Sequence, residues 1–286
     1  MENNQLNKSN KLYYERFDAY SRFLHLLVII SFLSLALTGM IIKFSDSSVF
    51  KTLSDLMGGY EVTGSIHRFA AIITFLYFFL HISYLINKRK KRKTSFKEML
   101  KGESSLVPNK RDWEEFKATL KWFLGKGPRP VYGRWTYWEK FDYFAVFWGV
   151  AIIGTSGLIL WFPEFFTSLG IPGEIINIAT IIHSDEALLA VGFIFTIHFF
   201  NTHFRPDKFP MDTVIFTGKV ELEELKEDRA REYELIQTDE KYKERVTDIA
   251  PSPALERAAR IFGFTALTIG LLIIILIIYT MIFVYQ

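Results

Sequence analysis

Residues 175–200 read IINIATIIHSDEALLAVGFIFTIHFF. The stretch is long enough to cross the bilayer, because about 20 predominantly apolar residues in a helix span about 30 Å of hydrocarbon. It contains two histidines, His183 and His198. Ionisable side chains are costly inside a membrane and usually serve a function there. The stretch therefore predicts a membrane-spanning helix that carries two functional imidazoles.

Four other stretches of the 286-residue chain have the same apolar character, and half of all residues are hydrophobic. A buried helix of a soluble protein is usually shorter and amphipathic. We therefore predict an all-α integral membrane protein with five transmembrane helices: a bundle of four spans and a fifth, C-terminal span. The predicted spans are residues 23–42, 64–86, 143–162, 175–200 and 262–285.

Basic residues predict the topology. The run Lys88–Lys93 directly follows the second span, whereas loop 43–63 has two basic residues and loop 163–174 has none. Basic clusters beside a span stay on the cytoplasmic side. We expect a multi-pass protein of a bacterial inner membrane with a cytoplasmic N-terminus and a periplasmic C-terminus. The polar first 22 residues are not expected to be a cleaved signal peptide. The basic run favours membrane lipid over nucleic acid as a partner.

The predicted spans divide the chain into segments of different character. Trp113, Phe116, Leu120 and Phe123 share one helical face, which predicts an amphipathic helix at the membrane interface. Residues 132–138 are typical of an aromatic belt. We expect a solvated helix over residues 221–245, where charges alternate. The predicted segments are 1–86 (N-terminal segment and spans one and two), 87–142 (cytoplasmic loop with the interfacial helix), 143–211 (spans three and four), 212–261 (charged cytoplasmic segment) and 262–286 (span five).

Histidine spacing indicates the chemistry. His67 and His81 are fourteen residues apart on span two, about 40° short of four helical turns and about 21 Å along the axis. His183 and His198 are fifteen apart, about 60° past four turns and about 22 Å along the axis. Both helices run inward, so His67 and His183 share the outer level. His81 and His198 share the inner level with His25 of span one.

Two levels of paired imidazoles predict two b-type haems. Two imidazoles on one iron leave no open coordination position, which favours electron transfer. Zinc or copper sites do not take ligands at this separation, and a histidine proton relay is the alternative. The chain has no cysteine, so it holds no c-type haem or iron–sulfur cluster. Spacing leaves both His25 and His81 as partners of His198.

Polar residues near the predicted haem edges have candidate roles. Arg22 and Arg68 lie where a guanidinium could pair with haem propionates, although terminal arginines also extend to the interface without a partner. His203, Arg205 and Asp207 follow span four and form a possible quinone site that handles protons. The alternative for Arg205 and Asp207 is that they only terminate the helix.

These motifs resemble the cytochrome b subunits of respiratory nickel–iron hydrogenases and the gamma subunit of formate dehydrogenase. The resemblance covers spans one to four. It implies an outer haem on His67 and His183, an inner haem on His25 and His198, and a quinone beside the inner haem. The residues that carry it are Arg22-Phe-Leu-His25, Leu37-Thr38-Gly39, Ile66-His67-Arg68, His183 and His198.

The stretches His183–Glu186 and Asn201–Met211 look closer still to di-haem cytochromes b that accompany periplasmic multihaem c-type cytochromes. His81 is additional to the hydrogenase-type ligands and resembles the paired-histidine helices of bc-type cytochromes. It leaves the inner ligand pair open and leaves room for a third haem that uses His81 or His203.

The function predicted from the sequence is electron transfer between the quinone or menaquinone pool and a periplasmic redox partner. That partner is a multihaem cytochrome c or another respiratory oxidoreductase subunit. The chain is then an electron-transfer subunit of a quinone-linked complex. The alternatives are a haem-containing structural anchor without quinone turnover and a histidine-relay proton transporter.

Overall fold

The computed structural model describes residues 11–93 and 95–284. The chain divides into two compact units. The membrane unit comprises Phe23–Ile86, Phe144–Asp212 and Ile261–Gln286, and the polar unit comprises Met1–Arg22, Asn87–Tyr143 and Thr213–Arg260. The expectations for residues 1–10 and for the C-terminal tail, residues 285–286, lie outside the described residues.

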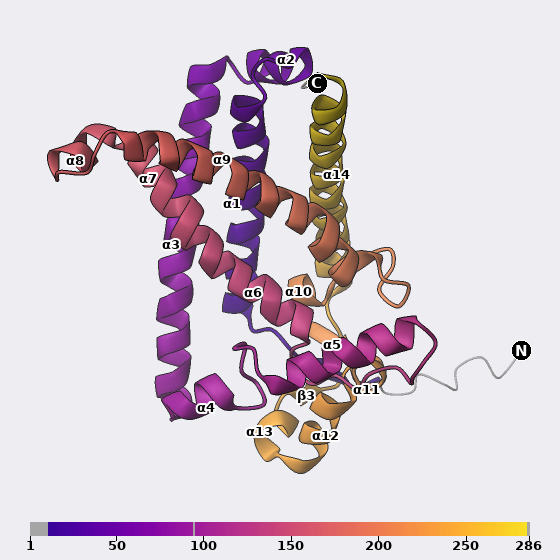
Figure 1. The fold of residues 1–286 in the computed structure, drawn as a ribbon. Helices are drawn as coiled ribbons and strands as arrows, with labels where there is room; N and C mark the ends of the chain where they lie inside the picture. The colour runs from indigo at the N-terminus through magenta and orange to yellow at the C-terminus, as the bar shows by residue number, and fades with distance from the viewer. Residues whose placement is uncertain (1–10, 94, 285–286) are drawn as a thin grey trace, which may run out of the picture. The chain divides into compact units, whose positions relative to one another are not determined.

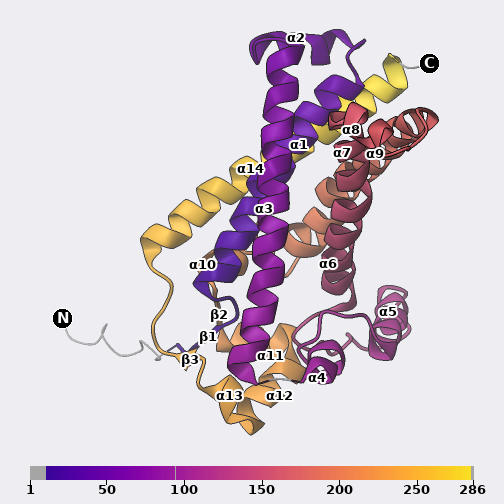
Figure 2. The ribbon, with the colours of Figure 1, turned by 90° about the vertical axis from the view of Figure 1, so that its left-hand side faces the viewer.

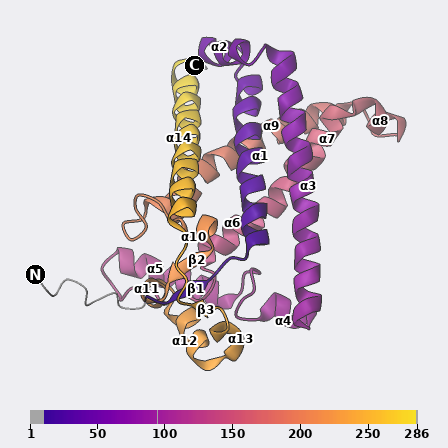
Figure 3. The same ribbon diagram turned by 180° about the vertical axis from the view of Figure 1, so that it is seen from behind.

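Five helical segments in the described part of the chain are long and apolar enough to cross a membrane, which confirms the predicted spans. Helical backbone is expected there because every N–H and C=O must be satisfied within the segment. The segments are Ala19–Lys43, Tyr60–Lys91, Tyr137–Trp161, Glu174–Phe204 and Pro253–Phe283. Figures 1 and 3 show the long helices α1 (Ala19–Lys43), α3 (Tyr60–Arg92) and α14 (Pro253–Phe283) from opposite sides.

Spans three and four are not regular α-helices. Each contains π-helical turns, which are rare and frequently occur at functional sites. In span four, His198 and His203 both lie within π segments. The elements of span three are α6 (Tyr137–Gly149), η1 (Val150–Gly154) and α7 (Thr155–Trp161), and those of span four are α9 (Glu174–Phe193), η2 (Ile194–His198) and η3 (Phe200–Phe204).

The membrane unit is held by packing of α1, span four and α14 around one apolar cluster. Met40 and Ile41 of α1, Phe195 of η2 and Ile277 of α14 are buried in it. Gly270 of α14 lies so close to η2 that an added Cβ would come within 2.7 Å of Phe195. Small residues of this kind let membrane helices approach. The short helices α2 (Ser48–Leu56) and α8 (Pro163–Ser168) belong to the loops between spans (Figure 2).

The polar unit contains a three-stranded antiparallel sheet in the order β2-β1-β3. Tyr14 of the central strand pairs with Val220 on one side and Val246 on the other. Tyr14 is fully buried, with Leu225 and Ile236 in the same core. The elements of this unit are β1 (Tyr13–Glu15), α4 (Phe96–Lys101), α5 (Lys110–Phe123), α10 (Val214–Thr217), β2 (Lys219–Glu221), α11 (Leu222–Asp228), α12 (Ala230–Thr238), α13 (Glu240–Lys243) and β3 (Val246–Thr247).

Buried ion pairs join the segments of the polar unit. Arg16 and Arg134 each donate to the other's backbone carbonyl, at 2.6 and 2.7 Å, and both form ion pairs with Glu232. Burial raises the pKa of Glu232, but the charges of Arg16 and Arg134 outweigh it and hold this pKa below its usual range. Glu232 is therefore ionised at neutral pH. Removing one partner of such a buried network is strongly destabilising.

This organisation corrects two expectations from the sequence. Residues 221–245 do not form one solvated helix, because Leu225, Glu232 and Ile236 are buried in the polar unit. Tyr132 and Trp138 are not belt residues, because both are buried and their rings lie 5.0 Å apart. The Tyr132 hydroxyl lies 2.8 Å from the Thr119 hydroxyl of α5.

Candidate haem-binding site

The first histidine site joins α3 and α9. The imidazole rings of His67 and His183 lie with their centres 6.1 Å apart and their planes at 77°. Two metal–nitrogen bonds of about 2 Å, with about 1.1 Å from each nitrogen to its ring centre, place two rings about 6 Å apart across one metal atom. The separation of His67 and His183 therefore fits two imidazoles on opposite sides of one iron.

Hydrogen bonds fix the tautomer of both rings. The Nδ1 atom of His183 lies 2.9 Å from the carbonyl oxygen of Ile153, which only accepts, so Nδ1 carries the proton. The Thr38 hydroxyl donates to the Ser34 carbonyl at 2.6 Å, so it accepts from Nδ1 of His67 at 2.9 Å. Both rings then keep the Nε2 lone pair for a metal, and metal-binding histidines are typically oriented in this way.

Glycines leave room for both rings. A Cβ on Gly157 would lie 2.9 Å from Cε1 of His183, and a Cβ on Gly39 would lie 3.3 Å from Cε1 of His67. Within the described residues, no cluster of three or more histidine, cysteine or acidic side chains could hold a metal ion. A haem needs only two protein ligands because the porphyrin supplies the other four. The donor set and its surroundings therefore fit a haem.

We expect Gly157→Ala to disturb this site, because the new methyl group would displace the His183 ring. Haem content or the midpoint potential of one haem should change, with a smaller change for Gly39→Ala. Gly192→Ala on α9 is the matched control, since no atom lies within 4 Å of its added Cβ. Redox titration of the purified variants measures these effects. Identical titrations for Gly157→Ala and Gly192→Ala would contradict the assignment.

The second histidine site contains His25 of α1, His198 of η2 and His203 of η3. Their imidazoles lie within range of electrostatic interaction with one another. A π turn rotates by about 80° per residue instead of about 100°. With the π turn η2 included, the rotation about the helix axis from His183 to His198 is about 20° short of four turns. In a regular helix it would be about 60° past four turns. His198 is thereby directed more nearly to the side of His183 than a regular helix would direct it.

His81 has different neighbours. Its ring stacks on Tyr77 of the same helix, with centres 5.9 Å apart, and meets the ring of Phe147 on span three at 6.1 Å. Tyr84 is a third aromatic neighbour, at 6.5 Å. Electrostatic interactions therefore group His25 with His198 and His203, and the ring contacts given for His81 are with Tyr77, Phe147 and Tyr84. The ligand role of each remains a prediction.

The other predicted site residues have these positions. Nη1 of Arg22 donates to the carbonyl oxygens of Phe216 and Thr217, at 3.1 and 3.2 Å. Arg68 is exposed and within electrostatic range of His67. Arg205 forms an ion pair with Asp207 at 3.3 Å. The predicted propionate and quinone contacts of these residues involve groups outside this chain and stay predictions.

The hydrogen-bond partners of the first site were not predicted from the sequence. Thr38 is the partner of His67, and the hydroxyl of Ser156 lies 3.4 Å from Nδ1 of His183. A signal was present in the sequence, because Thr38-Gly39 and Ser156-Gly157 repeat one pattern of a hydroxyl residue followed by glycine on two different spans. In each pair the hydroxyl contacts a histidine and the glycine makes room for the same ring.

The fold and the histidine site define a membrane protein built to hold haem. A family model described as prokaryotic cytochrome b561 matches residues 16–204, which is more than half of the chain. The chain belongs to this family, and the cytochrome b resemblance predicted from the sequence is confirmed. It is a multi-pass membrane cytochrome b for electron transport with haem b. The match covers spans one to four and all six histidines. No curated protein matches the chain.

Proposed function

We propose that the chain is a di-haem cytochrome b that transfers electrons between membrane quinone and a redox partner on the periplasmic face. The observation that carries this proposal is the His67–His183 pair, whose rings lie 6.1 Å apart. The group of His25, His198 and His203 supports a second haem, because His198 lies about 22 Å from His183 along span four.

The chain's residues hold and orient the haems, and bound haem supplies reversible one-electron transfer. His67 with His183, and His25 with His198, are the proposed axial pairs. Two imidazoles per iron leave no position for oxygen or substrate. The hydrogen bonds from Nδ1 to Thr38 and to Ile153 fix the ring orientation and raise the basicity of the ligating nitrogen.

The proposed quinone end is near His203. Its Nδ1 atom is buried and makes no hydrogen bond within the described residues. A neutral imidazole at this place can accept a proton from a quinol. The Arg205–Asp207 ion pair follows directly in the chain and offers a route for that proton to the polar boundary. Menaquinol is the expected donor or product.

The direction across the membrane follows from charge. The run Lys88–Lys93 favours a cytoplasmic position for the end of span two and for the N-terminus. The first histidine site is then the periplasmic one, in a bacterial inner membrane. The chain has no cysteine, so the next electron carrier belongs to a partner, proposed as a multihaem cytochrome c or another respiratory redox subunit.

A menaquinol analogue added to the oxidised, purified protein tests the proposal. We expect reduction of both haems, inhibited by quinone-site inhibitors. His203→Ala should keep both haems and slow this reduction by on the order of a hundredfold, the range for loss of a positioned proton acceptor. Asp46→Asn in loop 43–63 is the control.

Two other outcomes of this experiment would indicate a different function. Full haem content without reduction by the quinol would contradict the quinone proposal and favour a haem-containing structural anchor. Absence of haem absorbance would favour a histidine proton relay.

A further inference from the structure

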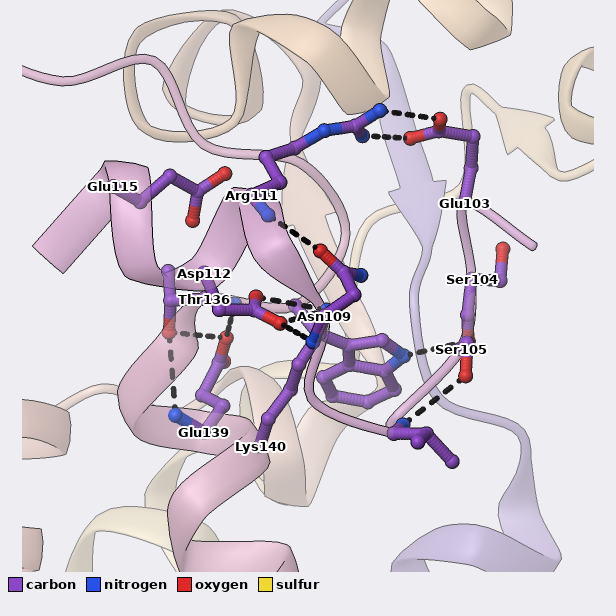
Figure 4. A network of polar contacts seen from close by, with 12 residues as sticks. Glu103, Ser104, Ser105, Asn109, Arg111, Asp112, Glu115, Thr136, Glu139 and Lys140 are labelled. Atoms are coloured by element: carbon purple, nitrogen blue, oxygen red, sulfur yellow. Dashed lines mark hydrogen bonds and ion pairs between the residues drawn. The ribbon is translucent and has the colours of Figure 1, made fainter. Parts of the chain in front are cut away.

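The helix α5 in the polar unit buries its polar side. Asp112 forms an ion pair with Lys140 at 2.8 Å, and Glu115 forms one with Arg231 at 3.0 Å. Thr119, on the same side, is buried against Tyr132. Figure 4 shows Asp112 and Lys140 in this network. Because burial otherwise penalises ionised groups, these pairs fix how α5 is rotated on the unit.

The apolar side of α5 is consequently left outside. Trp113 is 58% exposed, Leu120 46%, Phe123 67% and Leu124 68%. A contiguous exposed apolar face of this kind marks an interaction surface. Successive residues are rotated by about 100° around the axis of α5. Around this axis the buried polar side covers an arc of about 60°, and the apolar side covers the adjoining arc of about 100°.

Lysines border the apolar face on the edge away from the body of the unit. Lys110, Lys117 and Lys121 are exposed and lie within about 40° of one another around the helix. The Lys117 ammonium lies 5.6 Å from the centre of the Trp113 ring. Glu114 is the acidic side chain on this edge, and it faces Lys110 at 3.9 Å. The border is therefore net positive.

The aromatic face leads directly to a membrane span. Phe116 stacks on Trp113 with ring centres 5.4 Å apart and meets Tyr137 edge-on at 5.5 Å. Tyr137 is the first residue of the third span. A face that is apolar, bordered by lysines and continuous with the start of a span has the chemistry of a bilayer surface, where apolar side chains enter the headgroup region and lysines meet anionic phosphates.

We propose that α5, together with Leu124 directly after it, is a docking surface for anionic phospholipid. The surface is formed by Trp113, Phe116, Leu120, Phe123 and Leu124, with Lys117 and Lys121 at its border. It attaches the polar unit to the bilayer surface. This role involves neither the histidine sites nor the quinone, so its test is independent of the test of the proposed function.

The absence of cysteine permits a test with single labels. An environment-sensitive fluorophore is placed at Leu120→Cys, at Phe123→Cys, and at the control Glu223→Cys, whose side chain is 72% exposed on α11. The full chain is reconstituted in nanodiscs of phosphatidylcholine, alone or mixed with phosphatidylglycerol. We expect a lipid-borne quencher to quench the labels at 120 and 123, more strongly with phosphatidylglycerol, and to spare the label at 223.

Lys117→Gln and Lys121→Gln test the charge. Each should lower the preference for phosphatidylglycerol by about fivefold, the contribution of one lysine near an anionic surface. Equal quenching at 120, 123 and 223 would overturn the proposal. Labels at 120 and 123 that are shielded from a water-soluble quencher, yet not reached by the lipid-borne one, would overturn it too and indicate a covering protein or a second copy.

Discussion

His183→Ala is expected to lose one of two haems, and His67→Ala is expected to give the same spectrum. The two rings face each other at 6.1 Å, and no other of the six histidines lies at this level of the spans. Under the proposed ligation, alanine leaves the iron with one protein ligand and no substitute. Haem quantitation and redox titration of both variants should show one remaining haem with an unchanged midpoint potential.

Thr180→Ala is the matched control for that experiment. Thr180 is exposed on α9, close before His183, and its hydroxyl donates to the Ile176 carbonyl of its own helix. It should keep two haems. If His67→Ala or His183→Ala also keeps two haems with both potentials, these residues are not axial partners.

His25→Ala and His81→Ala should have opposite outcomes. His25 lies within electrostatic range of His198 and His203, whereas His81 contacts Tyr77 and Phe147 through its ring. We expect His25→Ala to lose the second haem and quinol oxidation together. His81→Ala should keep both haems and change only a potential or the turnover rate.

The first haem provides the internal control for these two variants. Its spectrum and potential should persist in both, which shows that the bundle has folded. The reverse pattern, with haem lost from His81→Ala and retained in His25→Ala, would reassign the ligand to span two. The core would then resemble that of bc-type cytochromes.

The membrane spans could be predicted from sequence because hydrocarbon imposes a simple rule on each segment separately. Length and hydropathy identify a span without knowledge of its neighbours. The polar unit could not be predicted in this way. Its sheet joins Tyr14 to Val220 and Val246, and Glu232 meets Arg134 across almost a hundred residues. Such contacts leave no periodic signal, so residues 221–245 look solvated in sequence.

The histidine site was partly predictable for a related reason. Helical periodicity predicts which histidines share a side and a level, and it selects His67 with His183. It assumes a regular helix, however, and the π turns of η2 alter the direction of His198. It also cannot rank His25 against His81, because both fall at one depth. The interaction of His25 with His198 and His203 and the ring contacts of His81 with Tyr77 and Phe147 exist only in the folded bundle, and the choice of ligand stays a prediction.

The proposed bundle holds two haems between histidine pairs. Pyridine haemochrome quantitation per chain, together with a reduced-minus-oxidised spectrum, counts these haems. We expect two b haems per chain with the spectrum of bis-imidazole iron. Three haems would add His81 or His203 to the ligands. One haem or none would rule out two levels of histidine-ligated haem in this bundle.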